Sequence, residues 1–234
     1  LALVAVFEGA VHARSAREDA RLTAGQAAAV GADGAMRLVV TPPDAVQWTI
    51  RYDPLFAYLA GPRGAEAEAP LPPAVRPSYR AYRQGDPAAA LRLLDAVPPA
   101  ERDARYHVYR AALLLAVGPE SAREAEEAVA QALAAAPESP EAHAAGAVIA
   151  VAVNDKEEAL ARAERAVRFG PRSTAAHLAR SYALQAQFRL EDALRSAAAA
   201  AESSDDPLLW SRVAELQIAL GQPSAAARAA ERAL

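Results

Sequence analysis

The sequence contains four histidines, the side chains best suited to bind a metal: His12, His107, His143 and His177. His143 and His177 are 34 positions apart (177 − 143), so they would take equivalent places in a repeating fold. A zinc site needs three or four nitrogen, sulfur or carboxylate ligands, and no carboxylate or third histidine stands at ligand spacing from this pair. The pattern therefore favours structural packing over metal binding.

Other catalytic patterns are missing from the sequence. The chain has no cysteine, which excludes a thiolate zinc site, a cysteine nucleophile and a disulfide framework. Glu124, Glu126 and Glu127 have the pattern of solvated helix charges rather than of a catalytic pair. No phosphate-binding loop, dinucleotide fingerprint, zinc-protease motif or serine-nucleophile motif occurs. We therefore expect a protein that is not an enzyme and that uses no cofactor or metal.

Composition and charge further limit the classes of protein to which this chain could belong. The 234 residues are 53% hydrophobic and 23% charged, which is typical of a folded globular chain. The formal net charge of −4 argues against a nucleic-acid partner, since such binders need a basic face. The most apolar run, Ala145–Val153, is about half of the roughly 20 residues that span a bilayer, so no membrane span is expected. Met36 is the only methionine, so we expect a processed product or a piece of a longer protein.

The elements that position these side chains follow from an internal repeat. Alanine and proline recur at an interval of 34 residues, which is typical of stacked helix–turn–helix units. By this register Ala145–Val153 is the first helix of the third unit, although its β-branched residues alone favour a strand. Asn154 and Asp155 would end that helix, and the pairs Glu158–Arg162 and Glu164–Arg168 would stabilise the next one. The repeated positions are Ala125, Ala159 and Ala193, then Ala132, Ala166 and Ala200, and finally Pro137 and Pro171.

The repeating unit resembles the tetratricopeptide repeat over roughly residues 77–234. This resemblance implies a mostly α fold, a right-handed α-solenoid of about five antiparallel helix pairs, of which the first is short and the last incomplete. The last unit matches the family pattern best, at Trp210, Ala214, Gly221, Ala226 and Ala233.

The sequence also departs from the family pattern at defined places. His143 and His177 stand where an aromatic anchor is usual, and Phe188 replaces the turn glycine. The step from Ala193 to Ala226 is 33 residues (226 − 193), so the register of the last unit shifts by one.

In this family the first helices of the pairs line a concave surface, so the resemblance implies a groove that binds a protein or peptide. Its middle is apolar at Val148 and Val151, and two interpretations stay open. Either neighbouring helices of a narrow superhelix cover these valines, or a hydrophobic partner segment lies over them. The groove residues implied by the family register are Tyr79, Tyr82, His107, Arg110, Val148, Val151, Leu178, Tyr182, Gln185, Glu215 and Ile218.

Residues 1–53 have a different pattern, with short β segments that form a small β-rich module and make the protein α+β overall. Two apolar runs split by the sequence GADG predict a β-hairpin over 27–40. Alternating apolar residues favour a strand over 46–52, with a short helix capped by Asp44 as the weaker alternative. Residues 54–76 are rich in glycine, proline and acidic residues, which predicts a connector or linker.

The sequence VFEGAVHARS followed by LTAGQAAAV resembles the later part of the FecR-type domain, a β-rich module of bacterial envelope proteins. The matching features are the Glu8–Gly9 turn, the Val11–Ala13 strand and the turn at Ala24–Gln26. The family's earlier strands are absent, so the module is a partial one. The resemblance implies a place in the bacterial envelope, periplasmic or at the cell surface, while a cytoplasmic location stays open. Trp48 and Tyr52 are expected to dock this module onto the first repeat.

Together these observations predict a non-catalytic scaffold of the bacterial cell envelope that binds a protein or peptide in the groove. The alternative is self-association, in which the chain is a structural subunit of a surface layer, a filament or a large envelope complex. A segment of a neighbouring copy would then bury Val148, Val151, Leu178 and Ile218.

Overall fold

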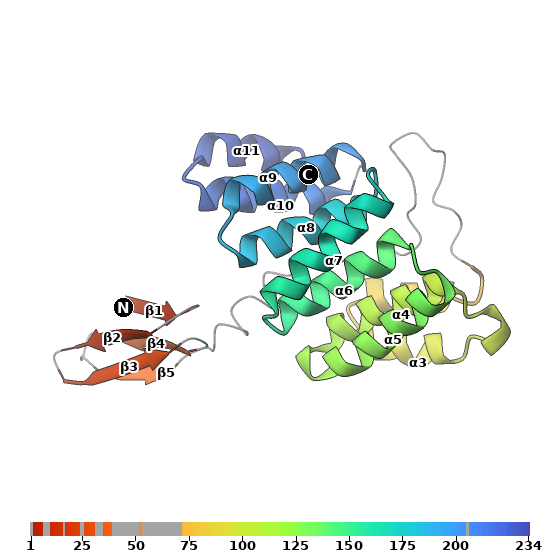
Figure 1. Cartoon of the computed structure of the whole chain (residues 1–234), viewed down its shortest axis with the longest axis horizontal. Helices are drawn as coiled ribbons and strands as arrows, with labels where there is room; N and C mark the ends of the chain where they lie inside the picture. Colours follow the sequence, from red (N-terminus) through yellow and green to blue (C-terminus); the bar gives the residue numbers. More distant parts are fainter. Residues whose placement is uncertain are drawn as a thin grey trace. The chain divides into compact units, whose positions relative to one another are not determined.

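The computed structural model describes residues 2–6, 10–15, 17–23, 26–30, 35–38, 52, 72–204 and 206–234. The chain divides into two compact units, Leu1–Ile50 and Arg51–Leu234, the first built of strands and the second of helices (Figure 1). The predicted strand over 46–52 and the linker lie outside the described residues, except for Tyr52 and the last residues of the linker. Tyr52 is not in a strand.

The first unit contains antiparallel strands in two sheets. The hairpin predicted over 27–40 is confirmed, because Ala28 faces Leu38 and Val30 faces Met36 across the pair β4–β5; its turn lies outside the described residues. The buried side chains of this unit are Val6, Ala13, Leu22 and Ala28. One sheet has the order β1 (Ala2–Val6), β4 (Gln26–Val30), β5 (Met36–Leu38), and the other pairs β2 (Ala10–Arg14) with β3 (Asp19–Thr23).

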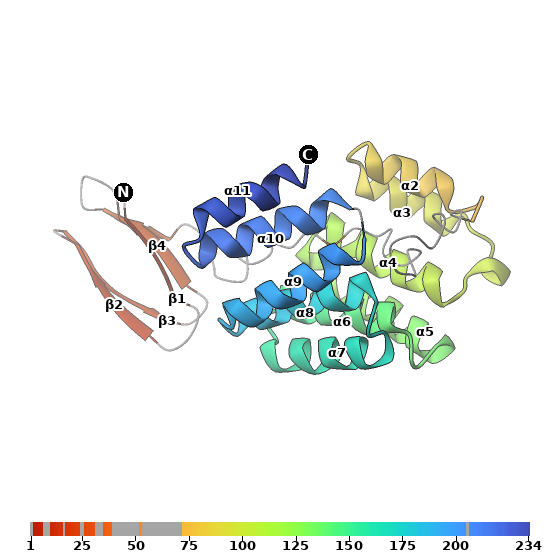
Figure 2. The same ribbon diagram turned by 90° about the horizontal axis from the view of Figure 1, so that it is seen from above.

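The second unit is a series of helix pairs, which confirms the predicted mostly helical repeat. In Figures 1 and 2 the pairs follow one another in chain order, from α2–α3 to α10–α11. Short 3-10 turns at Pro99–Glu101 and Pro119–Ser121 precede α4 and α5. The pairs are α2 (Arg76–Arg83) with α3 (Pro87–Asp95), α4 (Ala104–Val117) with α5 (Ala122–Ala135), α6 (Pro140–Ala152) with α7 (Lys156–Phe169), α8 (Thr174–Ala186) with α9 (Leu190–Glu202), and α10 (Pro207–Ala219) with α11 (Pro223–Glu231).

Side-chain caps start several of these helices. The hydroxyl of Ser139 accepts from Ala142 N–H at 3.1 Å before α6, and the carboxylate of Asp155 accepts from Glu158 N–H at 3.1 Å before α7. Each cap satisfies an amide of the first turn that has no partner within the helix. At these two places a polar cap residue therefore sets where the next helix begins.

The turn between the two helices has a left-handed backbone in several of the pairs. Asn154 and Phe188, which are 34 residues apart, have φ of 62° and 59°, and Gly221 has φ of 71° at the shifted register of the last pair. Glycine, and next asparagine, adopts this conformation with least strain. Phe188 adopts it in spite of the crowding of its Cβ against the backbone, because the helices on both sides hold the turn in place.

The alanine ladders form the contacts between helices. Ala125, Ala159 and Ala193 are each 0% exposed, so the repeated small side chains lie where helices approach closely. The apolar helix α6 packs against α4, α5, α7 and α8, and every residue from Ala142 to Ala152 is buried. The run that begins at Ala145 is thus a helix of the solenoid core, as the repeat predicts, and it ends at Ala152, one residue before the exposed Val153. In the described part of the chain, no helix is both long and apolar enough to cross a membrane.

Candidate functional site

The predicted groove residues lie on the first helices of the pairs. Tyr79 and Tyr82 are on α2, His107 and Arg110 on α4, Val148 and Val151 on α6, Leu178, Tyr182 and Gln185 on α8, and Glu215 and Ile218 on α10.

Exposure differs strongly among these residues. Val148 and Leu178 are 0% exposed, Val151 and Tyr182 are 3% exposed, and Ile218 is 61% exposed. The partly exposed members are Tyr79, Tyr82, His107, Arg110, Gln185 and Glu215. In this structure the middle of the predicted groove is therefore closed, and its accessible side chains lie toward the two ends of the series.

Arg212 of α10 brings three of these residues together. Its side chain is buried, with its guanidinium carbon 4.1 Å from the centre of the Tyr182 ring. Its Nη2 donates to Gln185 Oε1 at 2.5 Å, and its Nη1 lies 3.0 Å from Glu215 Oε2. Its Nε donates to Ser181 Oγ at 3.2 Å. The ion pair with Glu215, the hydrogen bonds to Gln185 and Ser181 and the stacking on Tyr182 offset the cost of burying this guanidinium.

Sequence reasoning missed Arg212, although a signal was present. Ala145, Ala179 and Arg212 are each the sixth residue of their helices, α6, α8 and α10. The two alanines are 0% exposed, so the arginine stands at a core position of the repeat. A charged residue at a core position indicates that polar partners surround it. Arg212 thus joins α10 to α8 and holds Gln185 and Glu215 in place.

The histidines have structural partners. His143 Nε2 donates to Pro137 O at 3.0 Å and His177 Nε2 donates to Pro171 O at 2.9 Å, so the same bond recurs one period later. The His143 ring also stacks on Phe169, with centroids 5.3 Å apart. Each bond ties the start of a helix to the turn before it. The structure thus assigns His143 and His177 a packing role at the aromatic-anchor position.

Burial lowers the pKa of His143, and the nearby positive charges of Arg162, Arg165 and Arg168 lower it further, while the bond to Pro137 acts in the opposite direction. Burial also lowers the pKa of His107, together with Arg102 and Arg110. Within the described residues, the Nδ1 atoms of His107, His143 and His177 are buried without a hydrogen-bond partner. Burial therefore favours the neutral form of the His107 and His143 rings.

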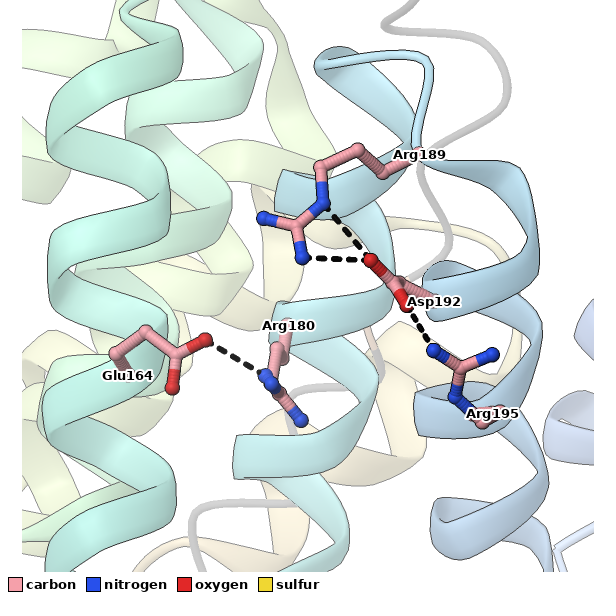
Figure 3. Close-up of polar contacts among 5 residues, drawn as sticks. All are labelled: Glu164, Arg180, Arg189, Asp192 and Arg195. Carbon is pink, nitrogen blue, oxygen red and sulfur yellow. Dashed lines mark hydrogen bonds and ion pairs between the residues drawn. The ribbon is translucent and has the colours of Figure 1, made fainter.

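Ion pairs lie along α7, α8 and α9 (Figure 3). Arg180 Nε donates to Glu164 Oε1 at 2.9 Å, so Glu164 pairs with α8 and not with Arg168 as the sequence predicted; the Arg168 guanidinium lies over the Phe169 ring instead. The other predicted pair is confirmed, since Arg162 Nε lies 2.6 Å from Glu158 Oε1.

At the start of α9, Asp192 accepts hydrogen bonds from Arg189 at 2.8 and 2.6 Å and from Arg195. These bonds, with Arg189 foremost, lower the pKa of Asp192. Arg180, Arg189 and Arg195 are thus each paired with a carboxylate of the same or a neighbouring helix.

The acidic residues of α5 and the histidines do not assemble into a metal centre. Among the described residues, no group of three or more histidine, aspartate and glutamate side chains could hold a metal ion. Glu126 instead accepts two hydrogen bonds from Arg162 Nη1, at 2.5 and 2.8 Å.

Neither a known protein family nor a curated protein sequence matches the chain. The FecR-type resemblance therefore has no support beyond the residues that carry it.

Solved structures do resemble the helical part. A thermophilic TPR protein of Thermus thermophilus, TTC0263, is 22% identical, with 69% of this chain and 88% of that chain covered and a TM-score of 0.62. MamA from Desulfovibrio magneticus RS-1 is 16% identical, with 70% and 95% covered and a TM-score of 0.46. The similarity to TTC0263 shows that the helical unit has a repeat fold of tetratricopeptide type.

Proposed function

We propose that this chain is a non-catalytic scaffold that binds a protein or peptide through the inner helices of its solenoid. The observation that carries the proposal is the tetratricopeptide-type fold, since stacked helix pairs present a long surface to a partner. The accessible ends of the predicted groove carry aromatic, charged and aliphatic side chains, namely Tyr79, Tyr82, Arg110, Glu215 and Ile218. Aromatic and arginine side chains are those that contribute most to protein interfaces.

The proposed location is the bacterial envelope. The support for it is the sequence resemblance of residues 6–30 to the FecR-type module. Fractionation of the native bacterium, with immunoblots for this chain, tests the location. Recovery with cytoplasmic markers alone would contradict it.

A pair of matched substitutions tests binding at the groove. Ile218 is 61% exposed on α10, and Val153 is 54% exposed at the end of α6, in the turn and outside the predicted groove. Both positions accept a charged side chain without burying it, so Ile218→Glu and Val153→Glu should fold equally well. In a pull-down from envelope extract, the wild type and Val153→Glu are expected to retain a partner that Ile218→Glu loses. Equal recovery by all three proteins would refute binding at this end of the groove.

Self-association is the less favoured function. Of its four expected anchors, Val148, Val151 and Leu178 are already buried within one chain, and Ile218 alone is exposed. Burying one isoleucine contributes about 1.5–3 kcal/mol. Association costs at least about 4 kcal/mol in lost translational and rotational freedom, so this single anchor does not suffice.

A further inference from the structure

The helix α2 concentrates positive charge at one end of the helical unit. It is the first helix of the series of pairs (Figure 2), and its sequence RPSYRAYR contains three arginines and no acidic residue. Its contribution to the formal net charge is therefore +3, whereas the whole chain has −4, so the remaining residues together carry −7 (−4 − 3). One short helix is thus strongly basic in a chain that is otherwise acidic.

The buried residues of α2 show which of its sides faces the core. Ser78 and Ala81, three positions apart, are buried, and the hydroxyl of Ser78 donates to a backbone carbonyl of α3 at 2.8 Å. Arg76, Arg80 and Arg83 follow one another at intervals of four and three residues, so they lie along one line on the opposite side of the helix. All three are exposed, and we call them the α2 basic row.

Two members of the α2 basic row have no carboxylate beside them. Within the part of the chain that the structure describes, neither Arg80 nor Arg83 forms an ion pair, whereas Arg162 and Arg180 each pair with a glutamate of a neighbouring helix. Like charges three or four residues apart on a helix repel one another and lower its stability. The spacing of these arginines therefore does not serve the stability of α2, and their charges are available to a ligand of opposite sign.

Two tyrosines of the same helix border the α2 basic row. The rings of Tyr79 and Tyr82 are stacked with their centres 6.4 Å apart and their planes at 28°, and both side chains are partly exposed. Tyr79 stands three residues after Arg76 and four before Arg83, so it is a neighbour of the row on the helix surface. Both tyrosines are predicted groove residues. The α2 end of the predicted groove thus combines guanidinium groups, which bind carboxylates, with aromatic rings, which pack against apolar side chains.

We propose that the α2 basic row binds an acidic segment of the partner protein, with carboxylates on Arg80 and Arg83 and an adjoining side chain on Tyr79. The inference deepens the proposed function and rests on it, because the row borders groove residues of α2. Charge complementarity carries it, since the row attracts carboxylates while the acidic remainder of the chain repels them. A nucleic acid is the less favoured polyanion, because one short row in a chain of net charge −4 is not the broad basic face that phosphate backbones require.

A fluorescein-labelled octaglutamate peptide tests the row by fluorescence anisotropy with the full chain, at about 50 mM salt, where screening is weak. The wild type is expected to bind this peptide, and about 0.5 M salt should weaken the binding. The double variant Arg80→Gln with Arg83→Gln removes both charges and should bind at least about tenfold more weakly. Arg80→Lys with Arg83→Lys keeps both charges and should stay within about threefold of the wild type.

The matched control is the double variant Arg123→Gln with Arg228→Gln. Both arginines are exposed, on α5 and α11, so this variant loses the same two charges but leaves the α2 basic row intact. It should bind octaglutamate as tightly as the wild type. All of these substitutions alter exposed side chains, so the thermal unfolding midpoints should stay close to that of the wild type and show that each variant folds.

Absence of octaglutamate binding by the wild type, or an equal loss in the control variant, would overturn the proposal. A loss in the lysine variant as large as that in the glutamine variant would overturn the role of charge. Tighter binding of a labelled oligo(dT) through the same two arginines would assign the row to nucleic acid instead. The pull-down tests the end of the groove at Ile218 with a natural partner, so its failure is distinct from failure of this peptide titration.

Discussion

The side chain of Arg162 occupies the space that a side chain at Gly146 would need. A Cβ atom at Gly146 would lie 2.5 Å from Arg162 Nη1 and 3.1 Å from its Cδ. Glycine on α6 thus opens a passage through which Arg162 of α7 reaches Glu126 of α5, while its Nε bonds Glu158 on its own helix. One guanidinium thus joins α7 to α5 across α6, because Gly146 of α6 lacks a side chain.

The first prediction concerns this pair. Gly146→Ala should lower the free energy of unfolding by about 1 kcal/mol, because the methyl group displaces Arg162 from Glu126 and this loss exceeds the gain in helix propensity. In the Arg162→Ala background the same change should raise the free energy of unfolding by roughly 0.5–1 kcal/mol. Urea unfolding of the four proteins in this double-mutant cycle measures the coupling. Effects that add without coupling would contradict the stated relationship.

A substitution in the turn at Phe188 is expected to stabilise the protein. Phe188 has φ of 59° and is 57% exposed, so its side chain contributes little burial while its backbone is strained. Phe188→Gly should raise the free energy of unfolding by about 0.5–1 kcal/mol, since relief of the left-handed strain exceeds the extra entropy of glycine in the unfolded chain. Asn154→Gly, at the equivalent turn, is the matched control and should change stability less, because asparagine tolerates this conformation. Thermal unfolding of both variants measures these changes. A midpoint temperature for Phe188→Gly below that of the wild type would contradict the prediction.

The lowered pKa of His143 predicts a dependence of stability on pH. In the unfolded chain a histidine titrates near pH 6.5, and in the folded protein burial holds the pKa of His143 below that value. As the pH falls below about 6.5, the unfolded state binds the proton first, so stability decreases until the folded pKa is reached. Above about pH 6.5 this group makes no pH-dependent contribution.

His143→Gln tests this directly, because glutamine can still donate to Pro137 O but does not titrate. Between about pH 7 and 5 the free energy of unfolding should fall less steeply for His143→Gln than for the wild type. Identical slopes in urea unfolding series would show that His143 does not contribute.

Replacing the buried side chain of Arg212 is expected to cause a large loss of stability. Arg212→Ala should cost about 2–3 kcal/mol, because it removes the stacking on Tyr182 and leaves polar atoms of Ser181 and Gln185 without their donor. Arg212→Lys should also destabilise, since an ammonium group cannot reproduce the planar fork of donors. Arg123→Ala removes an exposed ion pair with Glu127 and should change stability by less than about 0.5 kcal/mol. Equal effects of Arg212→Ala and Arg123→Ala would refute this account.

The state of association separates the scaffold from the self-assembling alternative. Because Ile218 is the one exposed side chain among the four expected anchors, we expect the purified chain to stay monomeric. Light scattering over a dilution series should give a constant mass. A mass that grows with concentration, and that Ile218→Glu abolishes, would favour self-assembly through the end of the groove.

Much of the fold could be predicted from the sequence because its determinants are local and repeated. The interval from Ala125 to Ala159 to Ala193 places a small residue at each helix contact, and it located the helix pairs that the structure describes. The same interval corrected the strand preference of Val148 and Val151, since a β-branched residue in a helix core is stabilised by packing rather than by propensity. The hairpin of β4 and β5 was likewise visible from its turn residues.

The partners of individual side chains were decided by the tertiary structure alone. Glu164 lies four residues from Arg168 but bonds Arg180, because α8 brings a second arginine within reach of α7. Arg162 reaches Glu126 only through the space at Gly146. Helical periodicity determines which face of a helix a residue occupies, but the choice among several charges on neighbouring faces depends on distances that only the packed helices define.

The sequence also could not predict whether the groove residues are exposed or buried. The family register placed Val148, Val151 and Leu178 on the inner helices, yet whether these residues are open or covered depends on how closely α4, α6 and α8 approach one another. Burial is a property of all the atoms around a residue, many of them distant along the chain. The sequence by itself determined the helices and their order, because those depend on contacts within one repeating unit. Only the tertiary structure decided which of their inner faces remain accessible to a partner.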